Sequence, residues 1–151
     1  MENYDLIVIG SGPAGYAAAM KGVNYQKRVC LVEGNHLGGA GIMNGALTSK
    51  TMWELSQDFA IAASVNRGYR ASGLTVDYRK VRKTVLQAAK KKQYDMLSQI
   101  ETFSESNGNK GNITLKRGWA TFVSKTCVEI VNNETTERIA GKDFIIATGS
   151  M

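Results

Sequence analysis

The feature that most constrains this chain is a short apolar run that passes directly into a glycine-rich turn. Leu6 to Ile9 are consecutive apolar residues, the turn is Gly10-Ser11-Gly12-Pro13-Ala14-Gly15, and an alanine-rich stretch begins at Tyr16. A run of strand length, such a turn and a helical stretch predict the strand, turn and helix that open a dinucleotide-binding βαβ unit. Because a glycine-rich loop alone also occurs in other α/β proteins, the residues that follow decide between these readings.

Each glycine of the turn has its own predicted purpose. Gly10 allows the tight turn after the strand, Gly12 lets a pyrophosphate approach the backbone, and Gly15 lets the helix and sheet lie close together. The phosphates would face the free amides of the first helical turn, which begins at Pro13 and Ala14, because the helix dipole favours negative charge there. Proline loses nothing at this position, because its missing N–H would have no partner within the helix.

A second predicted strand ends on an acid. The first helix should end near Asn24, and Arg28 to Glu33 has the composition of a buried strand. Glu33 follows the turn by about twenty residues, the place where a carboxylate accepts hydrogen bonds from an adenosine ribose. No arginine directly follows it, which argues against a phosphate on that ribose. The alternative is an exposed acid at a strand end.

Composition limits the classes of function. The chain has 151 residues, of which 43% are hydrophobic and 21% charged, as expected for a single globular domain. A formal net charge of +6 raises the possibility of nucleic-acid binding. However, the lysines lie mainly on one predicted helix without an adjoining aromatic platform, so we expect a basic solvated face and no nucleic-acid partner.

Other partners and locations follow from shorter observations. No apolar run has membrane-spanning length, and the first strand begins by residue 5, so we expect no membrane association. The expected location is the cytoplasm, or the mitochondrial matrix if a transit peptide has been removed. Cys30 and Cys127 predict reduced structural thiols, and His36, the only histidine, predicts no metal site.

The rest of the chain predicts two helices and several strands. One helix should span Leu47 to about Val65, and a longer one should begin after Asp77, a good N-cap. The polar stretch from Ser104 to Asn112 ends the second helix. The buried face of that helix is predicted from apolar residues at helical spacing: Val81, Val85, Ala88, Met96, Ile100 and Phe103.

The last third of the chain has the alternation of β-structure. We predict a small antiparallel meander that leads into a buried strand at Phe144 to Ala147. The meander strands are expected at 113–116, 119–123, 127–131 and from Arg138 onward.

The stretch from Leu37 to Lys50 resembles the pyridine nucleotide-disulfide oxidoreductase family. The family signature is G-G-T-C-x-N-x-G-C-x-P-S-K, and the residues kept in register are Gly38, Gly39, Gly45, Ser49 and Lys50. The resemblance implies an α/β fold, a Rossmann-like FAD-binding domain with a parallel sheet, helices and a small antiparallel meander. It also implies FAD as the cofactor.

The departures from the signature concern the redox chemistry. Gly41 and Ala46 stand where the family has its two redox cysteines, and Thr48 stands where it has proline. Neither Gly41 nor Ala46 can form a thiolate, the species that attacks a disulfide. We therefore assign no catalytic residue and expect flavin binding with electrons passing to a diffusible acceptor.

The resemblance also implies which residues contact the cofactor. Lys50 matches a lysine beside the flavin ring, with a helix-surface lysine as the alternative. Arg117 to Ala120 is similar to the segment whose backbone meets the adenine, and Ala147 to Ser150 to a second flavin-contacting turn. The cofactor-binding set is Gly10, Gly12, Pro13, Ala14, Gly15, Glu33, Gly34, Gly39, Ala40, Gly41, Lys50, Gly118, Ala120, Ala147, Thr148 and Gly149.

Domain organisation leaves two hypotheses. Residues 1–151 are expected to be the N-terminal part of the FAD-binding domain, without the family's nicotinamide-binding and dimer-interface domains, and inactive alone. The first hypothesis is a piece of an NAD(P)H-dependent, homodimeric flavoprotein oxidoreductase without the redox disulfide. The second is a non-catalytic remnant that binds a nucleotide or a partner. A plain NAD-dependent dehydrogenase is less favoured, because nothing after the βαβ unit supplies a hydride-transfer site.

Overall fold

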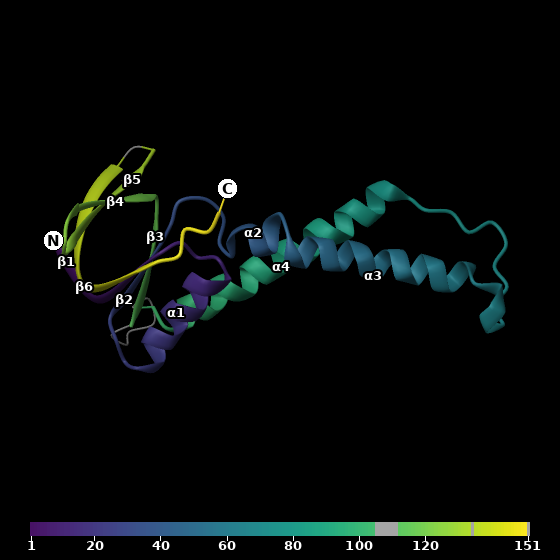
Figure 1. Ribbon diagram of the computed structural model, residues 1–151, viewed down its shortest axis with the longest axis horizontal. Coiled ribbons are helices and arrows are strands. Elements are labelled where there is room, and N and C mark those ends of the chain that lie inside the picture. Colours follow the sequence, from purple (N-terminus) through teal and green to yellow (C-terminus); the bar gives the residue numbers. More distant parts are fainter. Residues whose placement is uncertain (105–111, 134, 151) are drawn as a thin grey trace.

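The computed structural model describes residues 1–104, 112–133 and 135–150, which form a six-stranded sheet with helices against it and a long helical arm (Figure 1). Along the sheet the strand order is β3-β2-β1-β6-β5-β4. In chain order the elements are β1 (Glu2–Ile9), α1 (Pro13–Asn24), β2 (Val29–Glu33), α2 (Gly39–Met43), α3 (Ala46–Ala63), η1 (Val65–Arg67), α4 (Tyr78–Thr102), β3 (Ile113–Arg117), β4 (Trp119–Ser124), β5 (Cys127–Asn132) and β6 (Thr135–Ile146).

The predicted βαβ unit is confirmed at the centre of the sheet. β1 pairs in parallel with β2, with Leu6 opposite Val29 and Ile9 opposite Val32, and α1 forms the crossover between them. Every residue of β2 is buried. Its continuous apolar run before Glu33 is typical of a parallel strand that is covered on both faces. The helix ends at Asn24, where the sequence predicted its end.

The predicted membership of the antiparallel meander is wrong for its first strand. Ile113–Arg117 (β3) pairs in parallel with β2, with Ile113 opposite Val29, and the antiparallel part consists of β4, β5 and β6. The reason is the connection: α4 precedes β3, and a long helical crossover brings the chain back in the same direction. Short apolar alternation in the sequence does not specify which strand is the neighbour.

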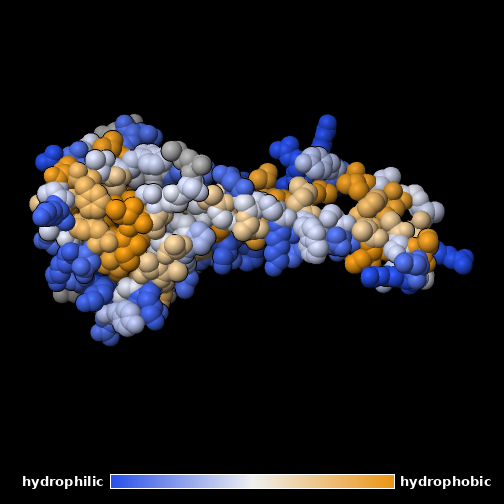
Figure 2. Space-filling model, viewed as in Figure 1, coloured by the Kyte–Doolittle hydropathy of each residue, from blue (hydrophilic) through white to orange (hydrophobic). Residues whose placement is uncertain are grey.

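β6 is a single strand with two kinds of pairing. Its first half pairs antiparallel with β5, and its second half pairs in parallel with β1. The sequence predicted its end as buried, and this is wrong: Ile145 is 37% exposed and Ile146 is 67% exposed. The described residues leave much of this end of the strand exposed, and Figure 2 shows apolar residues gathered on the sheet.

Two apolar clusters hold the sheet from its two faces. On one face α1 and α4 pack against Val8 and Leu31, and on the other Ile7 and Cys30 pack against Val128 and Ile139 of the meander. Neighbouring residues of β1 thus point to opposite clusters, as the pleat of a strand requires. The glycine turn follows directly from this buried central strand.

The arm consists of α3 and the first half of α4, which run side by side away from the sheet (Figure 1). Asp77 is the N-cap of α4, as predicted, and its side chain accepts hydrogen bonds from the backbone N–H groups of Arg79 and Lys80. Buried Met96 and Ile100 anchor the other end of α4 to the sheet cluster. None of the described helices combines the length and apolar character needed to cross a membrane.

The predicted buried faces of the two long helices are only partly confirmed. Val85, Met96 and Ile100 of α4 are buried, but Phe103, the residue after the helix, is 39% exposed. α3 buries none of its residues against the described part of the chain. The predicted helix end at Ser104 to Asn112 lies mostly outside the described residues.

The two cysteines differ in environment, and this gives a first testable result. Cys30 and Cys127 are free thiols, and burial within β2 raises the pKa of the Cys30 thiol to about 12. Because the thiolate is the reactive species, iodoacetamide at mildly alkaline pH should label Cys127 and leave Cys30 unmodified. Mass spectrometry of the intact and digested protein measures this. Labelling of Cys30 in the folded protein at the rate seen in urea would contradict the buried position of β2.

Candidate functional site

The candidate site lies where several parallel strands end. The carboxyl ends of β1, β2 and β6 lie at one edge of the sheet, with the end of β3 beside β2. Ligands of open α/β sheets bind at this edge, outside the carboxyl ends of the strands. The chain segments gathered here are the glycine turn after β1, Glu33 at the end of β2, and Ala147 directly after β6.

Gly10 and Gly15 are required by close backbone packing. Gly10 has φ of +98°, and a Cβ placed on it would lie 2.3 Å from the carbonyl oxygen of Ala147. A Cβ on Gly15 would lie 1.9 Å from the carbonyl oxygen of Gly10. The Gly10 N–H donates to the Val32 oxygen and the Ala147 N–H to the Ile9 oxygen, each at 2.8 Å. The turn is therefore held between β2 and β6, and α1 begins against it.

Gly12, in contrast, faces open space. A Cβ placed there meets nothing within 4 Å, and its backbone is extended, with φ of −60°. Pro13 is the first helical residue, as predicted, and within the described chain no side chain caps α1 and its first turn holds no acid. The first amides of a helix carry unsatisfied donors and partial positive charge, so this end of α1 can receive an anion.

Glu33 is bound directly to the glycine turn. The side chain is 8% exposed, and its Oε2 accepts hydrogen bonds from the Ser11 N–H (2.8 Å) and the Ser11 hydroxyl. Its Oε1 accepts from the Asn35 N–H at 2.7 Å. An ionised carboxylate offers about four acceptor positions, so Oε1 retains capacity for a ligand hydroxyl. The geometry thus places the predicted acid beside the predicted turn.

A short helix that the sequence analysis missed packs against the turn. α2 (Gly39–Met43) begins after Gly38, whose N–H donates to the Ser11 oxygen at 3.0 Å. A Cβ on Gly39 would lie 3.1 Å from the Gly12 Cα, and one on Gly41 would lie 2.9 Å from the Pro13 Cγ. The glycine pair at 38–39 could have indicated this helix start in the sequence. Both residues have positive φ, a conformation that glycine adopts readily.

Two further predicted segments lie beside Glu33 and Gly10. The Gly118 N–H donates to the Glu33 backbone oxygen at 3.0 Å, which brings the turn between β3 and β4 to the end of β2. The Trp119 ring covers Gly34, where a Cβ would meet the ring at 2.7 Å. Ala120 is half-buried against the meander cluster. Beyond Ala147, Thr148 and Gly149 are exposed.

Lys50 and its neighbours lie farther along the chain, on or before α3. The Lys50 side chain is 71% exposed and its Nζ lies 3.9 Å from Glu54 Oε1, one helical turn away. Ala46 is the first residue of α3, and Ala40 is exposed on α2. Lys50 is thus exposed on the surface of α3 in the described part of the chain, and its place beside a flavin ring stays a prediction.

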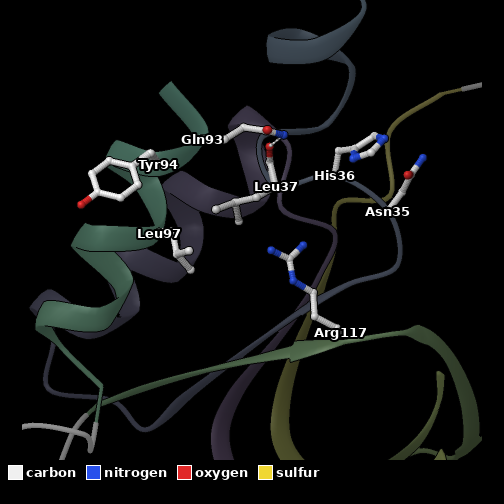
Figure 3. Close-up of a pocket in the computed structure, with 7 residues that line it drawn as sticks. All are labelled: Asn35, His36, Leu37, Gln93, Tyr94, Leu97 and Arg117. Atoms are coloured by element: carbon white, nitrogen blue, oxygen red, sulfur yellow. Dashed lines mark hydrogen bonds between the residues drawn. The ribbon is translucent and has the colours of Figure 1, made fainter. Parts of the chain in front are cut away.

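A hollow of about 400 Å³ opens beside the loop that follows Glu33 (Figure 3). The Gln93 side chain spans from α4 to this loop and donates to the Leu37 oxygen at 2.9 Å, and the Arg117 guanidinium points into the hollow. Sequence reasoning singled out few of its lining residues, because they come from separate segments: Asn35, His36, Leu37, Gln93, Tyr94, Leu97 and Arg117. Across the described residues, no group of three or more His, Cys, Asp or Glu side chains could hold a metal ion.

Comparison with known proteins finds relatives along nearly the whole chain. Dihydrolipoyl dehydrogenase of Geobacillus stearothermophilus is 31% identical over 147 residues, which cover 97% of this chain and 30% of the relative. Dihydrolipoyl dehydrogenase of Staphylococcus aureus is 32% identical, with the same coverage of both chains. The chain thus spans less than a third of the length of these relatives.

Solved structures show the same fold. The HOCl-induced flavoprotein disulfide reductase RclA from Escherichia coli, in its Cu(II) complex, superimposes with a TM-score of 0.79 at 20% identity, covering 99% of this chain and 29% of that one. This confirms the predicted Rossmann-like α/β fold. Residues 4–151 also match the sequence pattern of the family described as pyridine nucleotide-disulphide oxidoreductase. From this match and the two dehydrogenases, the chain belongs to the pyridine nucleotide-disulphide oxidoreductase family.

Proposed function

We propose that this chain binds FAD and forms the FAD-binding part of an NAD(P)H-dependent oxidoreductase. The observation that carries the proposal is the open position at Gly12, where a Cβ meets nothing within 4 Å. It lies at an uncapped helix start, and Ser11, the preceding residue, is bound to Glu33. The residues present therefore fit the diphosphate and ribose of a dinucleotide.

Two parts of the site would bind two parts of the cofactor: the start of α1 would bind the pyrophosphate, and Glu33 would bind the ribose. The amides of Ala14 and Gly15 would hold the pyrophosphate through hydrogen bonds and the helix dipole. Glu33 Oε1, which accepts one bond from Asn35, would accept a ribose hydroxyl. We expect the adenine near the backbone of Gly118 and Ala120, because the Gly118 N–H is already bound to the Glu33 backbone.

Bound flavin would supply reversible two-electron chemistry, and the protein would bind and orient it. Gly41 and Ala46 provide no thiol, and a Cβ on Gly41 would press against the Pro13 ring at 2.9 Å. We therefore propose that electrons leave for a diffusible acceptor rather than through a disulfide at these positions. We also propose that the parent protein uses NAD(P)H, forms a homodimer and lies in the cytoplasm. These properties belong to the whole protein, and the match covers only 30% of the relative's length.

Spectroscopy of the purified full-length protein tests the proposal. Bound flavin should give visible absorbance, and added FAD should lose fluorescence as it binds. ADP should compete with FAD, because both present the same diphosphate and ribose to the turn and Glu33. Protein that stays colourless after incubation with FAD would overturn flavin binding. If such protein still binds ADP, the nucleotide-binding remnant is the better description.

A further inference from the structure

The outer face of α4 carries a basic groove that the proposed flavin site does not use. A hollow of about 410 Å³ runs along this face, lined by Arg79, Arg82, Lys83, Leu86, Gln87 and Lys90. These residues recur at helical spacings of three and four, so they share one side of the helix. Buried Val85 and Ala89 mark the other side, which packs against the protein. The groove therefore points away from the described residues that pack against α4.

The cations that line the basic groove form no ion pair with a carboxylate among the described residues. Four of its six lining residues are Arg or Lys, and no carboxylate lines it. The ion pairs that the described residues form on α4 are those of Lys80 with Asp77 and of Lys91 with Asp95, and both lysines lie outside the groove lining. Hydrophilic side chains project from the arm over the start of α4 (Figure 2).

The clustered positive charges destabilise helix α4. Arg79 lies three and four residues before Arg82 and Lys83, and like charges at these spacings repel. Arg79 also lies in the first turn of α4, where the helix dipole disfavours cations. A bound group of negative charge would remove both penalties, so the groove suits an anionic partner.

The centre of the groove indicates what kind of anion fits. Leu86 lies between the cations and is 46% exposed, so it offers an apolar contact flanked by positive charges. A phosphate backbone would use the cations but leave the leucine in water, whereas an amphipathic acidic helix would use both. A second copy of this chain, with a net charge of +6, is a poor electrostatic match.

We propose that the basic groove binds an acidic amphipathic helix of a partner protein. The groove follows α4 for about three turns, roughly 17 Å, a length that matches a helix with carboxylates around one apolar residue. The site is distinct from the turn at Gly12, so the two can be occupied together. The proposal does not depend on which cofactor the chain binds.

Fluorescence anisotropy with the purified full-length protein tests this. The probe is a labelled peptide of about twelve residues, with glutamates at helical spacing around one leucine. The R82Q/K83Q/K90Q variant should bind it about tenfold more weakly. The matched control K21Q/K27Q/K125Q removes the same charge from exposed lysines elsewhere and should change affinity less than about twofold. Circular dichroism should show the same helix content in both variants.

Two more measurements separate the groove from general attraction. L86Q should weaken peptide binding about threefold, because the apolar contact is lost while all charges remain. Equal losses in the triple variant and its control would overturn the proposal. So would tighter binding of an oligothymidylate of equal charge, which indicates nucleic acid, or of phosphatidylserine vesicles, which indicates a membrane surface.

Discussion

Replacing Gly15 with alanine should strongly destabilise the protein. In the interior of an ordinary helix this change stabilises by about 0.5–1 kcal/mol. Here the new Cβ would lie 1.9 Å from the carbonyl oxygen of Gly10, and neither backbone can move without disturbing its neighbours. Gly10 is fixed by its bond to Val32. We expect a loss of about 3 kcal/mol or more in the free energy of unfolding, measured by urea denaturation followed by circular dichroism.

Gly12→Ala is the matched control, three residues away in the same turn. Its Cβ would meet nothing within 4 Å and its φ of −60° suits any residue. The expected cost is no more than about 1 kcal/mol, the cost of alanine at an N-cap. If Gly15→Ala proves as stable as Gly12→Ala, helix α1 does not contact the turn as described.

The parts that the sequence predicted correctly are those set by local chemistry. The apolar run of β1, the glycine turn, Pro13 at the start of α1 and Asp77 at the start of α4 all depend on residues close together in the chain. Glu33 could also be placed, because a βαβ unit fixes where its second strand ends relative to its first. Local signals therefore predicted the fold class and the meeting of Glu33 with the glycine turn, while the binding roles of these residues stay predictions.

The parts that could not be predicted depend on distant partners. Nothing in residues 113–117 indicates that β2, rather than β4, lies beside them; the crossover through α4 decides it. The burial of Ile146 was overestimated because an apolar strand end looks the same whether or not a neighbour covers it. Likewise the hollow beside Glu33 combines loop, helix and strand residues that no single motif joins.

Replacing Gly12 with leucine should strongly weaken cofactor binding while leaving the fold intact. The side chain would enter space that is empty of protein atoms within 4 Å, the same space that the pyrophosphate needs to reach the amides of α1. We expect affinity for FAD and for ADP to fall by about 100-fold or more, or ~2.8 kcal/mol. The free energy of unfolding without ligand should fall by only about 1 kcal/mol, from the changed N-cap. Fluorescence titration measures the first quantity and urea denaturation the second.

A loss of affinity without a matching loss of stability would show that Gly12→Leu blocks the binding site and does not unfold the protein. Ser56→Leu, on the exposed arm helix α3, adds the same kind of apolar side chain away from the turn and should leave both affinities unchanged. Gly12→Ala should fall between the original protein and Gly12→Leu, since a single methyl group obstructs less of the approach. If Gly12→Leu binds FAD and ADP as the original protein does, the phosphates do not lie at the start of α1. The open face of the turn would then serve another purpose, and the FAD proposal would lose its main support.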